Sequence, residues 1–199
     1  KGTLIMRYLD LRECKTGRER GLLHGSTFAG EISSLVTLRI YLACKISGFT
    51  RKGLLAIAEK HLPILKEFDD ELYEELLGVA EGSGCSPAEL VVLNQYTDIR
   101  DLSPEKWGDA GTTEGFTGEA DYDGGCTMLW SKTDQGPIFA QTWDMHASAM
   151  PYVMMLRVTD AAGDDAYLLT LTGCLGMAGL NAAGLCIGIN NLTSNDAVP

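Results

Sequence analysis

The stretch Asp123-Gly-Gly-Cys-Thr-Met-Leu-Trp-Ser131 decides the fold, because the apolar pattern of the chain changes at Cys126. Before this cysteine, apolar residues recur every three or four positions, which is the period of an amphipathic helix. After it, short apolar runs alternate with turns that contain Gly and Asp, which is typical of strands. Helices followed by strands, instead of the two in alternation, indicate an α+β fold. The sequence therefore predicts one structural domain of the α+β class.

Four helices are expected before Cys126, over residues 31–46, 53–68, 69–80 and 86–99. Pro63 predicts a kink or a break in the second helix, because proline has no backbone N–H to donate. Gly82-Ser-Gly84 ends the third helix. Ser86-Pro-Ala-Glu89 begins the fourth helix, with serine and glutamate spaced for a capping box.

Six strands are expected after the cysteine, in three hairpins over residues 126–131 with 137–143, 152–159 with 166–172, and 175–180 with 185–190. Most of these strands should therefore pair antiparallel. The apolar face of a sheet needs a covering layer. The last strands are expected either to pack on the N-terminal helices or to continue into further sequence.

An acidic linker, residues 101–125, separates the two halves and contains seven acids, one lysine and six glycines. So long a loop in a compact domain is usually functional or disordered, and we interpret this one as a processing segment. The expected organisation is a helical N-terminal segment, 1–125, followed by the beginning of a sheet region, 126–199.

Composition excludes several classes of function. The net charge of −11 disfavours nucleic-acid binding, which needs clustered Lys and Arg. The apolar runs are too short to span a bilayer, and no leader peptide opens the chain, so no membrane partner is expected. None of the six cysteines forms a C-x-x-C pair, and no metal or cofactor is expected. Free thiols favour a reducing compartment such as the cytoplasm.

Cys126 is the candidate nucleophile because two glycines precede it. Attack of a thiolate on the carbonyl before it needs an unhindered backbone that tolerates strain, which Gly124 and Gly125 supply. Hydrolysis of the resulting thioester would leave Cys126 with a free α-amino group. This amine, with a pKa of about 7.7–8.0, can act as the base for its own thiol. Taken alone, Gly-Gly-Cys more often marks a structural cysteine after a turn.

Two polar residues near strand ends fit the same chemistry. Asp144 follows Cys126 by eighteen residues, at the end of the partner strand of the predicted hairpin. The hairpin would bring Asp144 to the Cys126 amine. Asn190 ends the last predicted strand, where its amide and a backbone N–H can hold an oxyanion. Each of the two is equally consistent with a turn residue.

These motifs together resemble the acyl-coenzyme A:isopenicillin N acyltransferase family, N-terminal-nucleophile (Ntn) hydrolases related to penicillin V acylases and bile salt hydrolases. The matching segments cover nearly the whole chain in the family's order: Arg20–Gly25, Glu75–Gly84, Gly125–Thr127, Trp143–Asp144 and Gly179–Asn190. The resemblance implies an αββα sandwich and self-cleavage between Gly125 and Cys126. It also implies an alpha/beta heterodimer from one precursor, with a higher oligomer possible.

Carried over by position, the resemblance makes Cys126 the nucleophile, Asp144 the acid that orients the amine, and Asn190 the first oxyanion donor. The family's second asparagine and later arginine have no counterpart in this chain. Trp143, His146 and Asn191 are candidates for binding a small-molecule acyl amide.

Several interpretations of the function remain open at this point. The self-processing enzyme could hydrolyse a linear amide or transfer its acyl group to an acceptor other than water. A papain-like pair of Cys126 with His146 is one alternative, and a catalytically silent binding or structural protein on the same fold is another. His24 is expected to pack or cap a helix.

Overall fold

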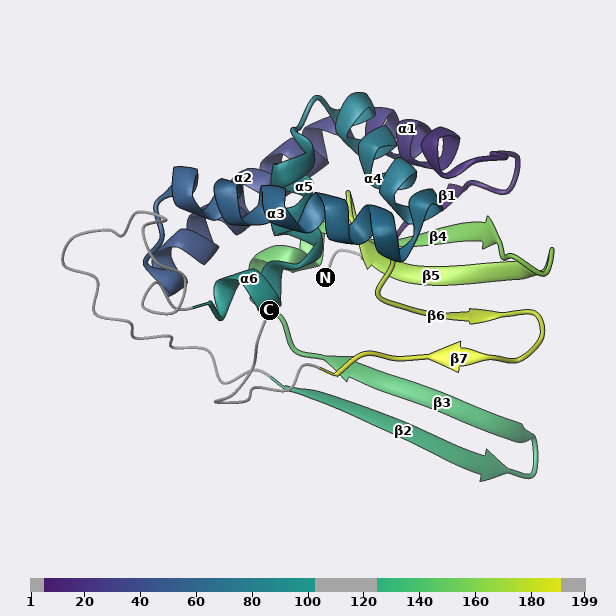
Figure 1. Ribbon diagram of the computed structural model, residues 1–199. Helices are drawn as coiled ribbons and strands as arrows, with labels where there is room; N and C mark the ends of the chain where they lie inside the picture. The colour runs from purple at the N-terminus through teal and green to yellow at the C-terminus, as the bar shows by residue number, and fades with distance from the viewer. Residues whose placement is uncertain (1–5, 103–124, 191–199) are drawn as a thin grey trace. The chain divides into compact units, whose positions relative to one another are not determined.

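The computed structural model describes residues 6–102 and 125–190. Figure 1 labels its helices α1 (Gly17–Thr27), α2 (Ala29–Ser47), α3 (Arg51–Phe68), α4 (Asp70–Ser83), α5 (Pro87–Asn94) and α6 (Tyr96–Arg100). The strands are β1 (Arg7–Asp10), β2 (Cys126–Thr133), β3 (Gly136–Trp143), β4 (Val153–Thr159), β5 (Asp165–Leu171), β6 (Ala178–Asn181) and β7 (Cys186–Ile187). The α+β class is confirmed, and the αββα sandwich stays a prediction.

The described residues separate into two compact units. The helical unit consists of residues 13–102 together with 172–175. The strand unit consists of residues 6–12, 125–171 and 176–190. Each unit therefore contains one short segment from the opposite side of Cys126.

Local sequence rules account for most of the helix ends. The Ser86 hydroxyl accepts from the Glu89 N–H at 3.3 Å, and the Glu89 carboxylate accepts from the Ser86 N–H at 2.7 Å, which confirms the capping box. Gly84 ends α4 at a φ of +73°, in the left-handed region that favours glycine. α3 continues through Pro63 without a break, since a proline removes only one helical hydrogen bond and neighbouring turns hold the helix.

Two predictions for the first half were incomplete. The helix expected over 86–99 is two helices, which meet at Gln95. The break falls beside Asn94, whose side chain bonds to backbone groups of residues 90, 173 and 175. α1 and β1 were not predicted at all, because α1 buries glycines on one face and β1 has only four residues.

α1 and α4 pack backbone against backbone through glycines. Gly17, Gly21 and Gly25 of α1 face α4, and Gly78 and Gly82 of α4 face α1. A Cβ added to Gly21 would lie 2.0 Å from the Glu75 carbonyl oxygen, and one added to Gly78 would lie 2.4 Å from the Arg18 carbonyl oxygen. Such distances exclude any side chain unless the backbones separate.

An ion pair closes this interface. Arg20 Nε lies 2.7 Å from Glu75 Oε2, and Glu75 is only 5% exposed. Burial raises the pKa of the Glu75 carboxyl, and the nearby Arg20 partly offsets that rise. The Arg20–Gly25 and Glu75–Gly84 motifs thus lie in the same helix pair, and their described contacts are structural.

The core of the helical unit consists of apolar side chains from α2, α3, α4 and α5, including Ile32, Leu35, Val36, Ile40, Leu54, Ile57, Leu76, Val79, Leu90 and Leu93. Their helical spacing is the one from which α2 and α3 were predicted. Within the described ranges, no single helix is long and apolar enough to cross a membrane. α4 and α5 reach that length and apolarity only as a pair, bent by 114°.

Residues 172–175 are held in the helical unit by polar side chains. Asn94 donates to the Gly173 carbonyl at 3.1 Å and accepts from the Leu175 N–H at 3.0 Å. The fully buried His24 accepts from the Gly173 N–H through Nε2 at 3.0 Å. This bond requires the neutral ring with its proton on Nδ1, and burial lowers the pKa of His24 to about 4.

The free energy of unfolding should fall as the pH drops from about 6.5 to about 4. In this range the unfolded chain protonates His24 and the folded chain does not, so acid favours unfolding by up to about 3 kcal/mol. Urea unfolding across this range, compared with His24→Gln, measures the effect. Glutamine keeps an acceptor for Gly173 without a titrating ring, so the variant should lose less stability on acidification.

The comparison with His24→Gln also removes the contribution of Glu75. Because the pKa of Glu75 is raised in the fold, this group stabilises the folded chain as the pH falls, in the opposite direction to His24. Glu75 is present in both proteins, so the difference between them isolates the histidine. Equal losses of stability in the two proteins would contradict the assignment.

The strand unit contains a five-stranded sheet, in the order β1-β4-β5-β6-β7, and the two-stranded hairpin β2–β3. β1 pairs parallel to β4, and the remaining neighbours pair antiparallel. The first two predicted hairpins are confirmed. In the third, β6 and β7 are shorter than predicted: Leu175 belongs to the helical unit, and β7 ends at Ile187, three residues before Asn190.

Candidate active site

The hairpin β2–β3 begins at Cys126 and ends at Trp143, and these two residues lie opposite each other. Its turn is tight, with Gly136 at a φ of +115° and the Thr133 hydroxyl donating to the Gly136 carbonyl at 2.7 Å. The closed hairpin brings the first residue of β2 next to the last residue of β3, as the sequence predicted.

Alternation along the hairpin decides which residues share a face with Cys126. Residues directly opposite each other in an antiparallel pair point to the same side. One face therefore carries Cys126, Met128 and Trp130 from β2 and Phe139, Gln141 and Trp143 from β3. Cys126 is half-buried, as are its three neighbours from β3.

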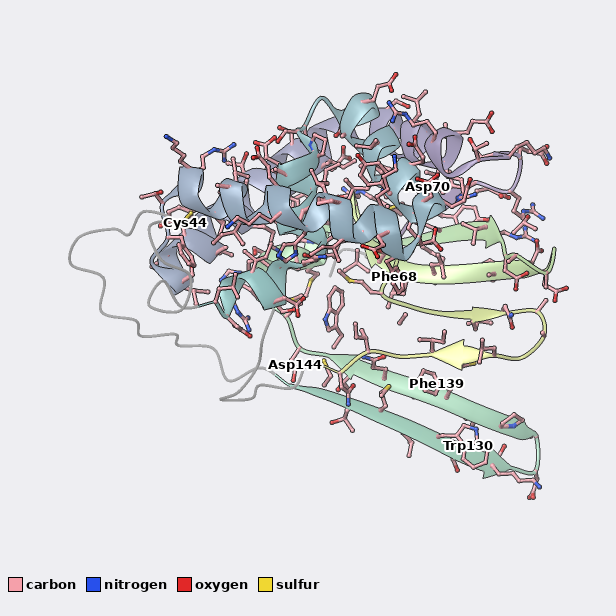
Figure 2. The ribbon with its side chains drawn as sticks, viewed as in Figure 1. Cys44, Phe68, Asp70, Trp130, Phe139 and Asp144 are labelled. Carbon is pink, nitrogen blue, oxygen red and sulfur yellow. The ribbon has the colours of Figure 1, made fainter. Side chains whose placement is uncertain are left out.

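Asp144 lies beside the peptide bond that was predicted to break. Its backbone N–H donates to the Gly125 carbonyl oxygen at 3.2 Å. Figure 2 shows Asp144 at the end of the hairpin where β2 begins, with Phe139 and Trp130 further along towards the turn. Asp144 is exposed, and it follows Trp143, the residue that lies opposite Cys126.

The residues after β7 lie against the Cys126 face of the hairpin. A Cβ on Gly188 would lie 2.4 Å from Met128 Sδ and 2.8 Å from Phe139 Cζ. The next residue, Ile189, donates its N–H to Gln141 Oε1 at 3.1 Å, and its carbonyl accepts from Gln141 Nε2. Figure 1 shows β3 running beside β7 and the residues that follow it. Asn190, which is exposed, comes directly after this contact.

A cavity of about 200 Å³ opens on the same face of the hairpin. It is mainly apolar, and its walls include Phe139, Gln141 and Trp143 of β3 and Met155, Tyr167 and Leu169 of the five-stranded sheet. A larger hollow of about 310 Å³ lies along β5, β6 and β7, and no hairpin residue lines it. The smaller cavity is therefore the one associated with the Cys126 face.

The other predicted binding residues divide into three cases. Trp143 lines the cavity. His146 is exposed, and it precedes a short 3₁₀ helix, Ala147–Tyr152. Its Nδ1 lies 2.7 Å from the Ser148 hydroxyl and accepts from the Ser148 N–H, so its described contacts are those of a cap on this helix. Asn191 lies outside the described residues, as does most of the acidic linker, residues 103–124.

One residue of the site was missed in the sequence. Gln141 bonds to Ile189 and lines the cavity. Period-2 alternation from Trp143 does put Gln141 on the Cys126 face, but nothing in the sequence indicates the segment to which it bonds. No group of three or more His, Cys, Asp or Glu side chains in the described ranges could hold a metal ion.

The geometry defines a candidate thiol-nucleophile site: a cysteine that begins a strand, a glycine before it, and an acid at the end of the paired strand. No protein-family model matches the chain. A curated relative is the acyl-coenzyme A:6-aminopenicillanic-acid-acyltransferase, 40 kDa form, of Emericella nidulans. The two are 25% identical over 177 residues, which cover 89% of this chain and 45% of that protein. The chain thus spans about half the length of this relative, and the similarity supports the resemblance to that acyltransferase family.

Proposed function

We propose that this chain is part of a self-processing Ntn enzyme that cleaves a linear amide, or transfers its acyl group, through a thioester on Cys126. The similarity to an acyltransferase supports an enzyme of acyl-transfer or amide chemistry. The proposal includes the αββα sandwich, the kinship with penicillin V acylases and bile salt hydrolases, and the alpha/beta heterodimer. The site acts on a small-molecule acyl amide.

Self-cleavage is an acyl shift from nitrogen to sulfur. The Cys126 thiol gives up its proton, and Sγ attacks the carbonyl carbon of Gly125. The C–N bond between the two residues then breaks, the departing nitrogen takes a proton, and a thioester remains. Water hydrolyses the thioester, which leaves a carboxylate on Gly125 and restores the thiol of Cys126 beside its new α-amine.

Turnover repeats this chemistry on a substrate. The α-amine of Cys126 takes the proton of its own thiol, and Sγ attacks the substrate carbonyl. The leaving amine takes the proton as the amide C–N bond breaks, and the acyl group stays on sulfur. Water, or another acceptor, then attacks the acyl-thioester and regenerates the thiol. The Asp144 carboxylate orients the amine, and Asn190 stabilises the oxyanion.

The observation that carries the proposal is the hydrogen bond from the Asp144 N–H to the Gly125 carbonyl oxygen, at 3.2 Å. This oxygen gains negative charge when the thiol attacks, and a donor already aimed at it stabilises that charge. The bond continues the antiparallel ladder of β2 and β3 by one pair, so the hairpin itself supplies this donor.

Intact mass of the purified protein tests the proposal directly. Self-processing gives two fragments that meet between Gly125 and Cys126, whereas a catalytically silent relative stays whole. A panel of N-acyl amino acids, penicillins and bile salt conjugates then defines the substrate. A single intact chain that turns over no member of the panel would refute the proposal.

Asp144→Asn should reduce amide turnover by about 10²-fold or more and leave the fold intact. Asparagine keeps the backbone N–H that donates to Gly125 and removes only the charge that orients the amine. The measurement is kcat on the processed variant, and circular dichroism verifies the fold. Asp134→Asn, in the turn at the opposite end of the hairpin, is the matched control and should keep wild-type rates. Wild-type kcat for Asp144→Asn would make Asp144 a turn residue.

A further inference from the structure

The side chain of Gln141 bonds to both backbone groups of a single residue. Its Oε1 accepts from the Ile189 N–H at 3.1 Å, and its Nε2 donates to the Ile189 carbonyl. A neighbouring strand satisfies a residue in the same way, with one donor and one acceptor. The amide of Gln141 thus replaces a backbone partner where β7 has already ended at Ile187.

Gly188, the residue before Ile189, packs against the same face of the hairpin. A Cβ there would lie 2.4 Å from Gln141 Oε1, so the backbone approaches this side chain as closely as glycine allows. Gly188 also meets Phe139, which lies two residues before Gln141 on β3. From Gly188 to Ile189 the chain therefore advances in the direction of β3, towards Trp143.

This direction matters because Trp143 lies opposite Cys126. Asn190 follows Ile189 immediately, so the backbone bonds of Gln141 set where Asn190 begins. Asn190 is exposed, and no strand pairing among the described residues includes it. If Asn190 is the oxyanion donor, another contact has to hold its side-chain amide in position. A catalytic group displaced by about 1 Å can lower the rate by about 10²-fold.

We propose that Gln141 is a positioning residue, which clamps the backbone of Ile189 and thereby holds the Asn190 amide for the oxyanion of the Cys126 reaction. This inference rests on the proposed function, and it adds a residue that acts without touching the substrate's reacting atoms. An amide side chain offers a donor and an acceptor side by side at any pH, because it does not titrate.

Gln141→Met removes both hydrogen bonds and keeps the length of the side chain. We expect kcat to fall by about 10- to 100-fold with KM changed by less than about threefold, because the loss falls on transition-state stabilisation. The backbone amide of Ile189 should exchange its hydrogen faster in this variant, because it loses its acceptor. Gln135→Met, in the hairpin turn, is the control and should change neither quantity.

Gln141→Glu gives a pH-dependent readout that a merely structural role would not. An ionised glutamate still accepts from the Ile189 N–H but cannot donate to its carbonyl, whereas a protonated glutamate can do both. The ratio of its kcat to that of the wild type should therefore rise as the pH falls towards the pKa of a glutamate, about 4.3.

The outcomes separate the two proposals. Absence of turnover in the wild-type protein would reject the proposed function, and the exchange rate of the Ile189 amide would still report on the clamp. Wild-type kcat in Gln141→Met despite a faster-exchanging Ile189 amide would reject the positioning role. Unchanged exchange in that variant would reject the clamp itself.

Discussion

Replacing Cys126 by alanine is expected to abolish both self-cleavage and amide turnover while leaving the fold intact. The proposed reactions both pass through a thioester on Sγ, and alanine offers no atom that can form one. Loss of both reactions corresponds to the largest effects seen when a nucleophile is removed, on the order of 10⁶ in kcat. Intact mass gives the first reaction, and acyl release from the best substrate gives the second.

Two further variants make this result specific. Cys186→Ala removes an exposed thiol from β7 of the same unit, and it should change neither reaction. Cys126→Ser should cleave slowly, because an alkoxide forms less readily than a thiolate. If Cys126→Ala still yields two fragments, the bond is cut by another protease and not by Cys126.

Gly21→Val is expected to unfold the helical unit or to destabilise it by several kcal/mol, of the order of the largest single-mutant effects. A Cβ at this position meets the carbonyl oxygen of Glu75 at 2.0 Å and the backbone nitrogen of Val79 at 2.8 Å. Both are backbone atoms of α4, so α1 and α4 would have to separate, and the Arg20–Glu75 ion pair would separate with them. Urea unfolding followed by helical circular dichroism measures the loss.

Gly30→Ala is the matched control for the helix interface. Gly30 lies near the start of α2, and a Cβ there would meet no atom within 4 Å. Alanine should therefore be neutral or stabilise the chain by up to about 1 kcal/mol, through its higher helix propensity. Equal effects of the two substitutions would mean that α1 and α4 are held together by contacts other than this close packing.

The sequence predicted what depends on neighbours along the chain. The capping box at Ser86, the helix end at Gly84 and the hairpin that brings Asp144 near Cys126 each follow from a few adjacent residues. α1 was missed because its packed face is made of glycine, whose role appears only when a second helix approaches. β1 was missed because four residues carry little pattern, and its partner β4 lies far along the chain.

In the candidate site too, contacts between residues near in sequence could be predicted, and contacts between distant residues could not. Cys126 and Asp144 share one hairpin, so their proximity could be predicted from the turn between them. Gln141 could not be assigned a role, since its partner Ile189 lies 48 residues away, on a segment that pairs with no strand in the part of the chain that the structure describes. Asn190 was expected at a strand end, but the strand stops at Ile187 because β7 pairs with only two residues of β6.

The exchange of segments between the two units sets an order of events during synthesis. β1 is synthesised more than 140 residues before its partner β4. The helical unit must likewise wait for residues 172–175, although its own helices are complete at Arg100. Neither unit can be finished until the chain has grown well past Cys126. A break at that residue during translation would therefore separate β1 from β4 before the two strands could pair.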